Sequence, residues 1–243
     1  MNNFNNYPYQ QGYATAAEAE NELTMRAYVA RVMRRVFGKM FLGLLVTALT
    51  SFFVMTNESL MTMFFGNRFA FWILAAAELG LVIWLTARIN KISQSMATLL
   101  FYVYSMLNGL TLTPIFLIYT ASSIATTFLI TAGTFGAMCL FGYVTKQDLS
   151  KFGSFLVMAL VGLIICAVVN IFLHSSTMEW IISLAGIAIF VGLTAWDTQS
   201  IKRMAEMTDP SQVGKVATMG ALSLYLDFIN LFIYLLRIFC RDN

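Results

Sequence analysis

Two aspartates, Asp197 and Asp227, lie inside stretches of chain that are otherwise hydrophobic enough to cross a bilayer. A third acid, Glu78, has the same setting. An ionised side chain at bilayer depth costs about 3 kcal/mol on insertion scales, so such residues usually belong to an ion path, a proton relay or an ion site. These three carboxyl groups are therefore the first candidates for a functional site.

The two aspartates are predicted to form a pair. Asp197 lies near the end of one apolar stretch, and Asp227 lies about 11 residues, or roughly 16 Å, into the next. If the first helix continues towards Met204, the two depths become similar, and a short connection makes the helices antiparallel neighbours. Two carboxyl groups within hydrogen-bonding distance share a proton, because ionising both is costly. The pair is a candidate pH sensor and a transient Ca²⁺ ligand.

The last apolar stretch has a polar stripe. Ser223, Asp227, Asn230 and Tyr234 recur at the spacing of one helix face. A polar face towards lipid would be unfavourable, so this helix is predicted to be surrounded by others. Ser223 and Asn230 are the residues of this stripe that we expect to line an ion path.

A shorter polar series, Tyr104, Asn108 and Thr111, precedes Pro114. A proline kink at this point could open a cavity. The alternative is that Asn108 and Thr111 only form hydrogen bonds between helices, and for these two residues alone that interpretation is preferred.

Arg88 follows Glu78 by ten residues, about 15 Å along a helix. It lies at about the depth expected for Asp197, so a salt bridge could latch the two helices together. In the other interpretation, Arg88 extends to lipid phosphates. The spacing of the residues favours neither the salt bridge nor the lipid contact.

The composition is that of a polytopic membrane protein. Of the 243 residues, 59% are hydrophobic and 11% are charged, and the mean hydropathy is +0.74. Soluble domains have about 25% charged residues. Apolar stretches near the length that crosses a ~30 Å hydrocarbon core recur along the chain. The predicted fold is all-α, with seven membrane helices at residues 36–56, 69–88, 96–118, 121–144, 152–173, 178–201 and 216–239.

Outside the spans the sequence is less specific. Residues 1–22 are polar and rich in Asn, Gln and Tyr, and they are predicted to be a disordered tail before a membrane domain at 23–243. The three cysteines have no metal-type spacing, and no basic cluster interleaved with aromatics suggests nucleic-acid binding. No resident cofactor is expected. Gly133, Gly136 and Gly142 are predicted to be points of close helix packing.

The basic residues predict an orientation. Of the 15 Lys and Arg residues, 12 lie in the N-terminal segment and in the even-numbered loops. The positive-inside rule then places the N-terminus in the cytoplasm and the C-terminus outside. The basic segment 26–39 is interpreted as a flank that sets this topology, with an interfacial amphipathic helix as the alternative.

Several segments resemble the transmembrane Bax inhibitor motif (Bax inhibitor-1) family, in its bacterial branch. The most similar is residues 221–239, ALSLYLDFINLFIYLLRIF. The others are NGLTLTPIF at 108–116, TKQDLS at 145–150, VNIF at 169–172 and TAWDTQSIK at 194–202. The resemblance covers the chain from the first span to the last.

The resemblance implies a fold whose last helix is central and enclosed by the other six, and a pH-sensitive Ca²⁺ leak through a bacterial inner membrane. Carried over to this sequence, Asp197 and Asp227 are the proton sensor, Arg88 is the latch, and Glu78 lines the pore. The expected partners are therefore the bilayer, Ca²⁺ and protons.

Two other functions compete with the leak. Intramembrane aspartyl proteolysis also uses two aspartates on neighbouring helices, but the chain has no GxGD or PAL sequence. An enzyme is therefore not predicted. The alternative that stays open is a non-conducting regulator that binds a membrane protease or a stress-response partner, and residues 1–22 are its best support.

Overall fold

The computed structural model describes residues 8–66, 68–89, 91–209 and 212–240, and side chains from residue 20 onward. Within these residues the structure is helical, without strands. Seven segments are long and apolar enough to cross a membrane, which confirms the all-α prediction and the seven spans. The helices are α1 (Pro8–Met55), α2 (Glu58–Phe65), α3 (Arg68–Arg88), α4 (Gln94–Leu112), α5 (Ile115–Ile118), α6 (Ala121–Val144), α7 (Ser150–Leu173), α8 (Ser176–Met207) and α9 (Val213–Phe239).

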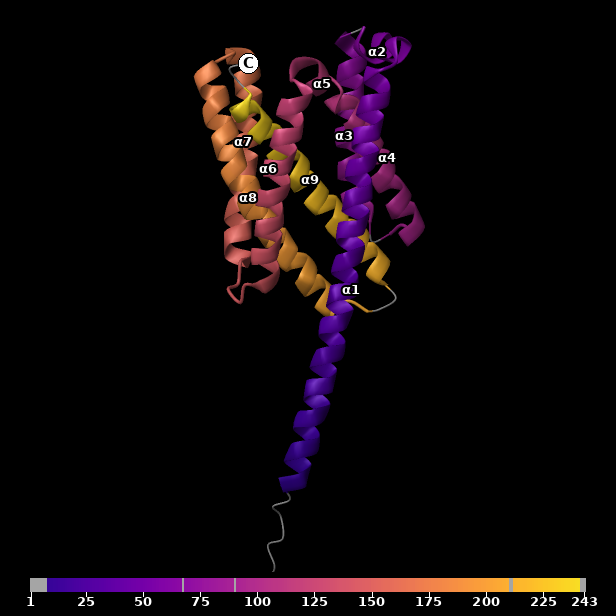
Figure 1. The fold of residues 1–243 in the computed structure, drawn as a ribbon, viewed down its shortest axis with the longest axis vertical. Coiled ribbons are helices and arrows are strands. Elements are labelled where there is room, and N and C mark those ends of the chain that lie inside the picture. Colours follow the sequence, from indigo (N-terminus) through magenta and orange to yellow (C-terminus); the bar gives the residue numbers. More distant parts are fainter. Residues whose placement is uncertain (1–7, 67, 90, 210–211, 241–243) are drawn as a thin grey trace, which may run out of the picture.

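Helix α1 is longer than the first predicted span. It begins at Pro8, inside the segment predicted to be a disordered tail, whereas residues 1–7 lie outside the described part. Residues 14–20 are almost entirely Ala and Glu, which are strong helix formers. The start of α1 projects beyond the bundle (Figure 1). The basic segment 26–39 is continuous with the span rather than a separate helix.

The third span is broken near its end. Helix α4 stops at Leu112, and the four-residue helix α5 follows Pro114, which cannot donate a backbone hydrogen bond. The chain then turns at Tyr119, and the hydroxyl of Thr120 accepts from the backbone N–H of Ser123 to cap α6. The predicted break between the third and fourth spans is therefore present.

Helix α9 connects two groups of helices. It packs against α8 and α6 on one side and against α1 and α4 on the other. Figure 1 shows it running obliquely between α6, α7 and α8 and the group of α1, α3 and α4. Its most apolar segment is 67% buried, compared with 11% for α3 and α7. Helix α3 packs mainly on α4 and helix α7 on α8, so α9 has four main partners among the other spans.

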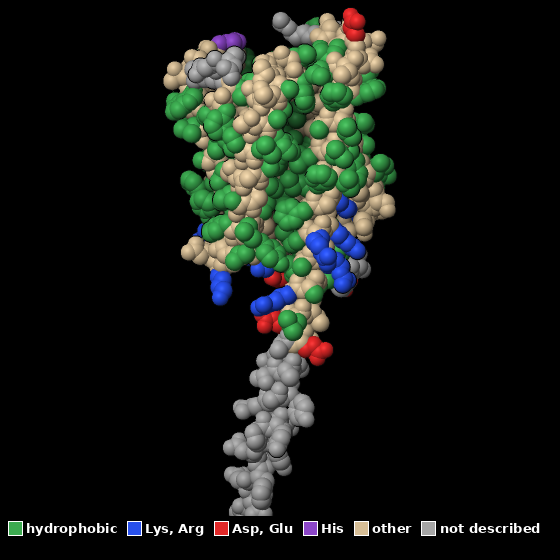
Figure 2. All heavy atoms as spheres, in the orientation of Figure 1, with side chains coloured by type: hydrophobic (Ala, Val, Ile, Leu, Met, Phe, Trp, Pro, Cys, Tyr) green, Lys and Arg blue, Asp and Glu red, His purple; other side chains and the backbone are tan. Residues whose placement is uncertain are grey.

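The outside of the bundle is apolar. Large side chains such as Phe41, Trp72 and Phe155 are more than half exposed. On the face drawn in Figure 2, hydrophobic side chains cover the body, and Lys and Arg gather at the end from which α1 projects. An apolar surface of this extent requires lipid contact, as expected for a multi-pass membrane protein.

One of the three glycines predicted as packing points lies at a close helix contact. A side chain at Gly142 would meet the backbone oxygen of Ala195 at 2.2 Å, so Gly142 allows α6 to approach α8. Gly133 and Gly136 have open space around them. The prediction was wrong for these two, because spacing alone does not tell which face of α6 meets a neighbour.

Candidate functional site

The structure brings Asp197 and Asp227 together across the interface of α8 and α9. Helix α8 continues to Met207, ten residues beyond Asp197, and this extension brings Asp197 to the depth of Asp227. The two carboxyl groups lie close enough to interact, and the hydroxyl of Ser223 lies beside Asp197. A carboxylate only accepts hydrogen bonds, so a hydrogen bond between the two groups requires a proton on one of them.

Little in the surroundings of the pair offsets its charge. Asp227 is only 4% exposed, and its Oδ2 atom has no hydrogen-bond partner. Among the described residues, no Lys or Arg forms an ion pair with either aspartate. An unbalanced negative charge at this position is costly. The pair is therefore sensitive to the loss of its shared proton.

Sequence reasoning missed a third group at this pair. The buried thiol of Cys139 on α6 lies close to both aspartates and beside the hydroxyl of Thr198. Cys139 follows Phe135 by one helical turn, and both side chains are buried on the same face of α6. Nothing in the spacing of the cysteines indicated this contact.

A second polar cluster, which is partly buried, surrounds Glu78 on α3. Asn108 Nδ2 donates to Glu78 Oε1, and Thr111 Oγ1 donates to Glu78 Oε2 at 2.8 Å. The hydroxyl of Tyr104 lies beside the same carboxylate. The polar series of α4 thus binds the carboxylate of α3, which agrees with the predicted hydrogen bonding between helices.

This cluster extends through α9 to α1. Tyr225 donates to Asn108 Oδ1 at 3.0 Å, and its oxygen lies 2.6 Å from Thr47 Oγ1. Thr47 also donates to the backbone oxygen of Ser105 at 2.8 Å. Tyr225 is fully buried. The sequence reading overlooked Tyr225 and Thr47, although a tyrosine so deep in an apolar helix normally needs a hydrogen-bond partner.

A third polar contact holds the start of α9. Lys39 Nζ on α1 donates to Thr98 Oγ1 on α4 at 2.7 Å and to Thr218 Oγ1 on α9 at 2.5 Å. The sequence suggested only a topology role for Lys39. Lys39 and Tyr225 therefore join α9 to α1 and α4, whereas Asp227 joins it to α8.

Arg88 stays apart from the aspartates, and Asn230 bonds within its own helix. Arg88 is exposed at the end of α3 and forms no ion pair with Asp197. The two residues sit in different helix groups, because α3 packs on α4 and α8 on α9. Asn230 Nδ2 donates to the backbone oxygen of Leu226 in its own helix at 2.8 Å.

The described residues contain no cluster of three or more His, Cys, Asp or Glu side chains suited to a metal ion. Two aspartates supply few of the six to eight oxygens that Ca²⁺ prefers.

On the side of the bundle towards α5, a cavity of about 480 Å³ lies between α1, α6 and α9. Its lining is almost wholly apolar and includes Phe128, Phe228 and Phe232.

The fold and these clusters define a seven-span helical membrane protein with a carboxyl pair inside the bilayer. A family profile described as "Inhibitor of apoptosis-promoting Bax1" matches residues 29–243. The chain belongs to this family, the Bax inhibitor-1 family.

Several bacterial proteins are similar in sequence over most of the chain. The inner membrane protein YbhL of Escherichia coli K12 is 49% identical, over 88% of this chain and 93% of the relative. A protein of Borreliella burgdorferi is 45% identical, over 85% of this chain and 90% of the relative. A protein of Caulobacter vibrioides is 36% identical, over 98% of both chains.

Proposed function

We propose that this protein is a pH-gated cation leak whose gate is the Asp197–Asp227 pair. The observation that carries the proposal is the close approach of two carboxyl groups across the interface of α8 and α9. Two carboxyl groups can form a hydrogen bond with each other only while the pair keeps a proton. The proposal involves no bond-cleaving chemistry and no resident cofactor.

Loss of the proton supplies the energy for opening. Two negative charges about 4 Å apart repel each other by roughly 4 kcal/mol at an effective dielectric constant of about 20. No ion pair to a described Lys or Arg offsets this repulsion, and the contact lies within a largely buried interface. Rising pH would therefore separate α8 from α9, and falling pH would close them.

The other contacts of α9 determine what moves. Lys39 and Tyr225 hold α9 to α1 and α4, so α9 would stay with that group when its contact to α8 is lost. The opening would then run along α9, between the two helix groups. Ca²⁺ is the proposed permeant ion, because carboxylate, hydroxyl and carbonyl oxygens suit this hard cation. Glu78, Ser223 and Asn230 are the proposed polar residues of the path.

Flux through reconstituted protein tests the gate. Liposomes that contain a Ca²⁺ dye are assayed from roughly pH 5 to 8, the range in which a perturbed carboxyl pair changes protonation. Wild type should leak more as the pH rises. In Asp227→Asn, the amide can hydrogen-bond to Asp197 whether or not Asp197 is ionised and cannot repel it as a second carboxylate does, so the flux should vary little with pH. An Asp227→Asn profile that overlays wild type would refute the sensor.

Asp148→Asn is the matched control. The backbone N–H and the hydroxyl of Ser150, together with Arg203, lower the pKa of Asp148, in the loop after α6, to about 2. Its carboxylate therefore stays ionised across the assay and cannot contribute to the profile. This variant should keep the wild-type pH dependence.

The alternative function is a non-conducting regulator that binds a membrane protease or a stress-response partner. The projection of α1 beyond the bundle favours it, because a free helix can present a binding face (Figure 1). Deletion of residues 1–22 separates the two functions. A leak should survive the deletion, whereas a regulator should lose its partner and show no flux in either form.

The proposed location is the bacterial inner membrane, with the N-terminus in the cytoplasm. The name of the Escherichia coli relative and the basic end of the bundle support this placement (Figure 2). A cysteine-specific impermeant reagent applied to whole cells should label an added C-terminal cysteine but not an added N-terminal one. The reverse pattern would invert the orientation.

A further inference from the structure

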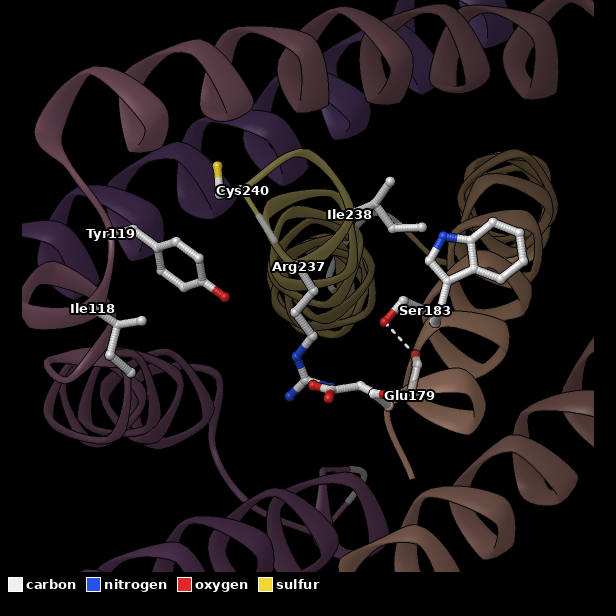
Figure 3. A pocket seen from close by; sticks show the side chains of 9 residues that line it. Ile118, Tyr119, Glu179, Ser183, Arg237, Ile238 and Cys240 are labelled. Atoms are coloured by element: carbon white, nitrogen blue, oxygen red, sulfur yellow. Dashed lines mark hydrogen bonds between the residues drawn. The ribbon is translucent and has the colours of Figure 1, made fainter. Parts of the chain in front are cut away.

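A small polar pocket lies at the end of the bundle opposite the projecting part of α1. Its volume is about 250 Å³, below the range of about 300–1,000 Å³ that is usual for drug-sized ligands. The start of α8, the end of α9 and the turn after α5 enclose it (Figure 3). Its lining residues are Ile118, Tyr119, Ser176, Glu179, Trp180, Ser183, Arg237, Ile238 and Cys240.

The pocket contains one charge of each sign. Figure 3 shows the side chains of Arg237, from α9, and Glu179, from α8, reaching into the same space. In the part of the chain that the structure describes, no ion pair joins them. Both charges are therefore available to a ligand.

A ring contact orients the guanidinium, and the backbone of Glu179 is held in the first turn of α8. The guanidinium of Arg237 lies 5.7 Å from the ring centre of Tyr234, within the range of a cation–π contact. Glu179 stands in the first turn of α8, and its backbone oxygen accepts a hydrogen bond from Ser183 Oγ at 2.8 Å. Burial raises the pKa of the Tyr119 hydroxyl, so this group stays a neutral donor at the pocket.

We propose that the pocket binds a small zwitterion, with its anionic group on Arg237 and its ammonium group on Glu179. A guanidinium binds phosphate or carboxylate with two parallel hydrogen bonds, which a lone point charge cannot do. The carboxylate of Glu179 is the matching acceptor for an ammonium group. The hydroxyls of Tyr119 and Ser183 supply further polar contacts.

The position in the fold selects the class of zwitterion. Trp180 and Ile118 are 44% and 69% exposed beside the pocket, at the end of the spans. Tryptophan is enriched where membrane meets water. A phosphate joined to an ammonium by a short linker fits both the charges and this depth. It occurs as the headgroup of phosphatidylethanolamine and as free phosphoethanolamine.

Thermal stability of the full-length protein in detergent tests the site. Three additives are compared: short-chain phosphatidylethanolamine, short-chain phosphatidylglycerol and free phosphoethanolamine. A ligand that binds the folded state raises the Tm with its concentration. The ethanolamine lipid should raise the Tm more than the glycerol lipid, which lacks the ammonium group. An equal shift with free phosphoethanolamine would assign the soluble ligand, and a shift with the lipid alone would assign the membrane headgroup.

Variants test whether the preference for phosphatidylethanolamine depends on the charges of Glu179 and Arg237. Glu179→Gln should weaken the binding of phosphatidylethanolamine by about tenfold, since one charge-assisted contact is lost. The binding of phosphatidylglycerol should stay unchanged. Arg237→Lys keeps the positive charge but cannot form two parallel hydrogen bonds to a phosphate. It should therefore weaken the binding of both lipids. Glu58→Gln, an exposed acid on α2 outside the pocket, is the control and should behave as wild type. Equal shifts with both lipids in wild type, or a preference that survives Glu179→Gln, would overturn the proposal.

Discussion

Tyr225 and Asp227 stand two positions apart on α9 and so point roughly 200° apart around its axis. Asp227 reaches α8, whereas Tyr225 reaches α1 and α4. One short stretch of helix thus carries a contact that depends on a proton and, on the opposite face, one that does not. The two can be tested separately.

Tyr225→Phe removes the hydroxyl that lies between Thr47 and Asn108. Hydrogen bonds between membrane helices are worth about 0.6 kcal/mol on average and up to about 1.7. We expect a loss of roughly this size in stability to denaturant, together with greater leak at low pH as α9 loosens from α1. Tyr102→Phe, on the same helix as Asn108 and half-buried, is the control and should change neither measurement.

Glu78→Gln tests the attachment of α3. Asn108 and Thr111 both donate to the carboxylate, and a glutamine offers one acceptor oxygen and opposes a donor with its NH₂ group. Because α3 has little other packing, protease cleavage in the connection between α3 and α4 should become faster. Cleavage at the wild-type rate would show that the carboxylate does not hold α3 in place.

At the scale of elements, the close approach of α6 to α8 supports the aspartate pair. Gly142 lies against the backbone of Ala195, two residues before Asp197. Gly142→Ala forces one of the two helices to shift, and overpacking of this kind costs typically 1–3 kcal/mol. The expected result is a lower Tm and a displaced pH profile of Ca²⁺ flux.

Gly136→Ala is the control for this contact. It makes the same substitution on the same helix, but its added methyl group meets open space. Alanine is also the better helix former, so its stability should equal or exceed that of wild type. A similar loss in both variants would show that α6 is sensitive to any added methyl group rather than to its contact with α8.

At the scale of the whole molecule, α9 is the main link between two helix groups, with a smaller direct contact of α1 with α8. If the proton on the aspartate pair controls that link, the groups should separate as the pH rises. Spin labels on exposed Met96 of α4 and Phe152 of α7, in protein without its native cysteines, would report the distance. It should lengthen from roughly pH 5 to 8 and stay constant in Asp227→Asn. A constant distance in wild type would argue against opening between the groups.

The sequence by itself determined the class of protein, the seven spans and the acids inside them. The hydrocarbon core imposes this result, since it demands some 20 apolar residues per crossing and makes every buried charge conspicuous. The matched depth of Asp197 and Asp227 followed only on the condition that the helix of Asp197 continues towards Met204, which the structure shows.

The tertiary structure alone decided which helix faces meet. It placed Cys139 beside the aspartates, joined Tyr225 to Thr47 and Asn108, and left Arg88 on a helix in the other group. Hydropathy does not fix the rotation of a helix about its axis, since lipid and protein interior are similarly apolar. That rotation depends on close contacts such as that of Gly142 with α8, between residues far apart in the chain.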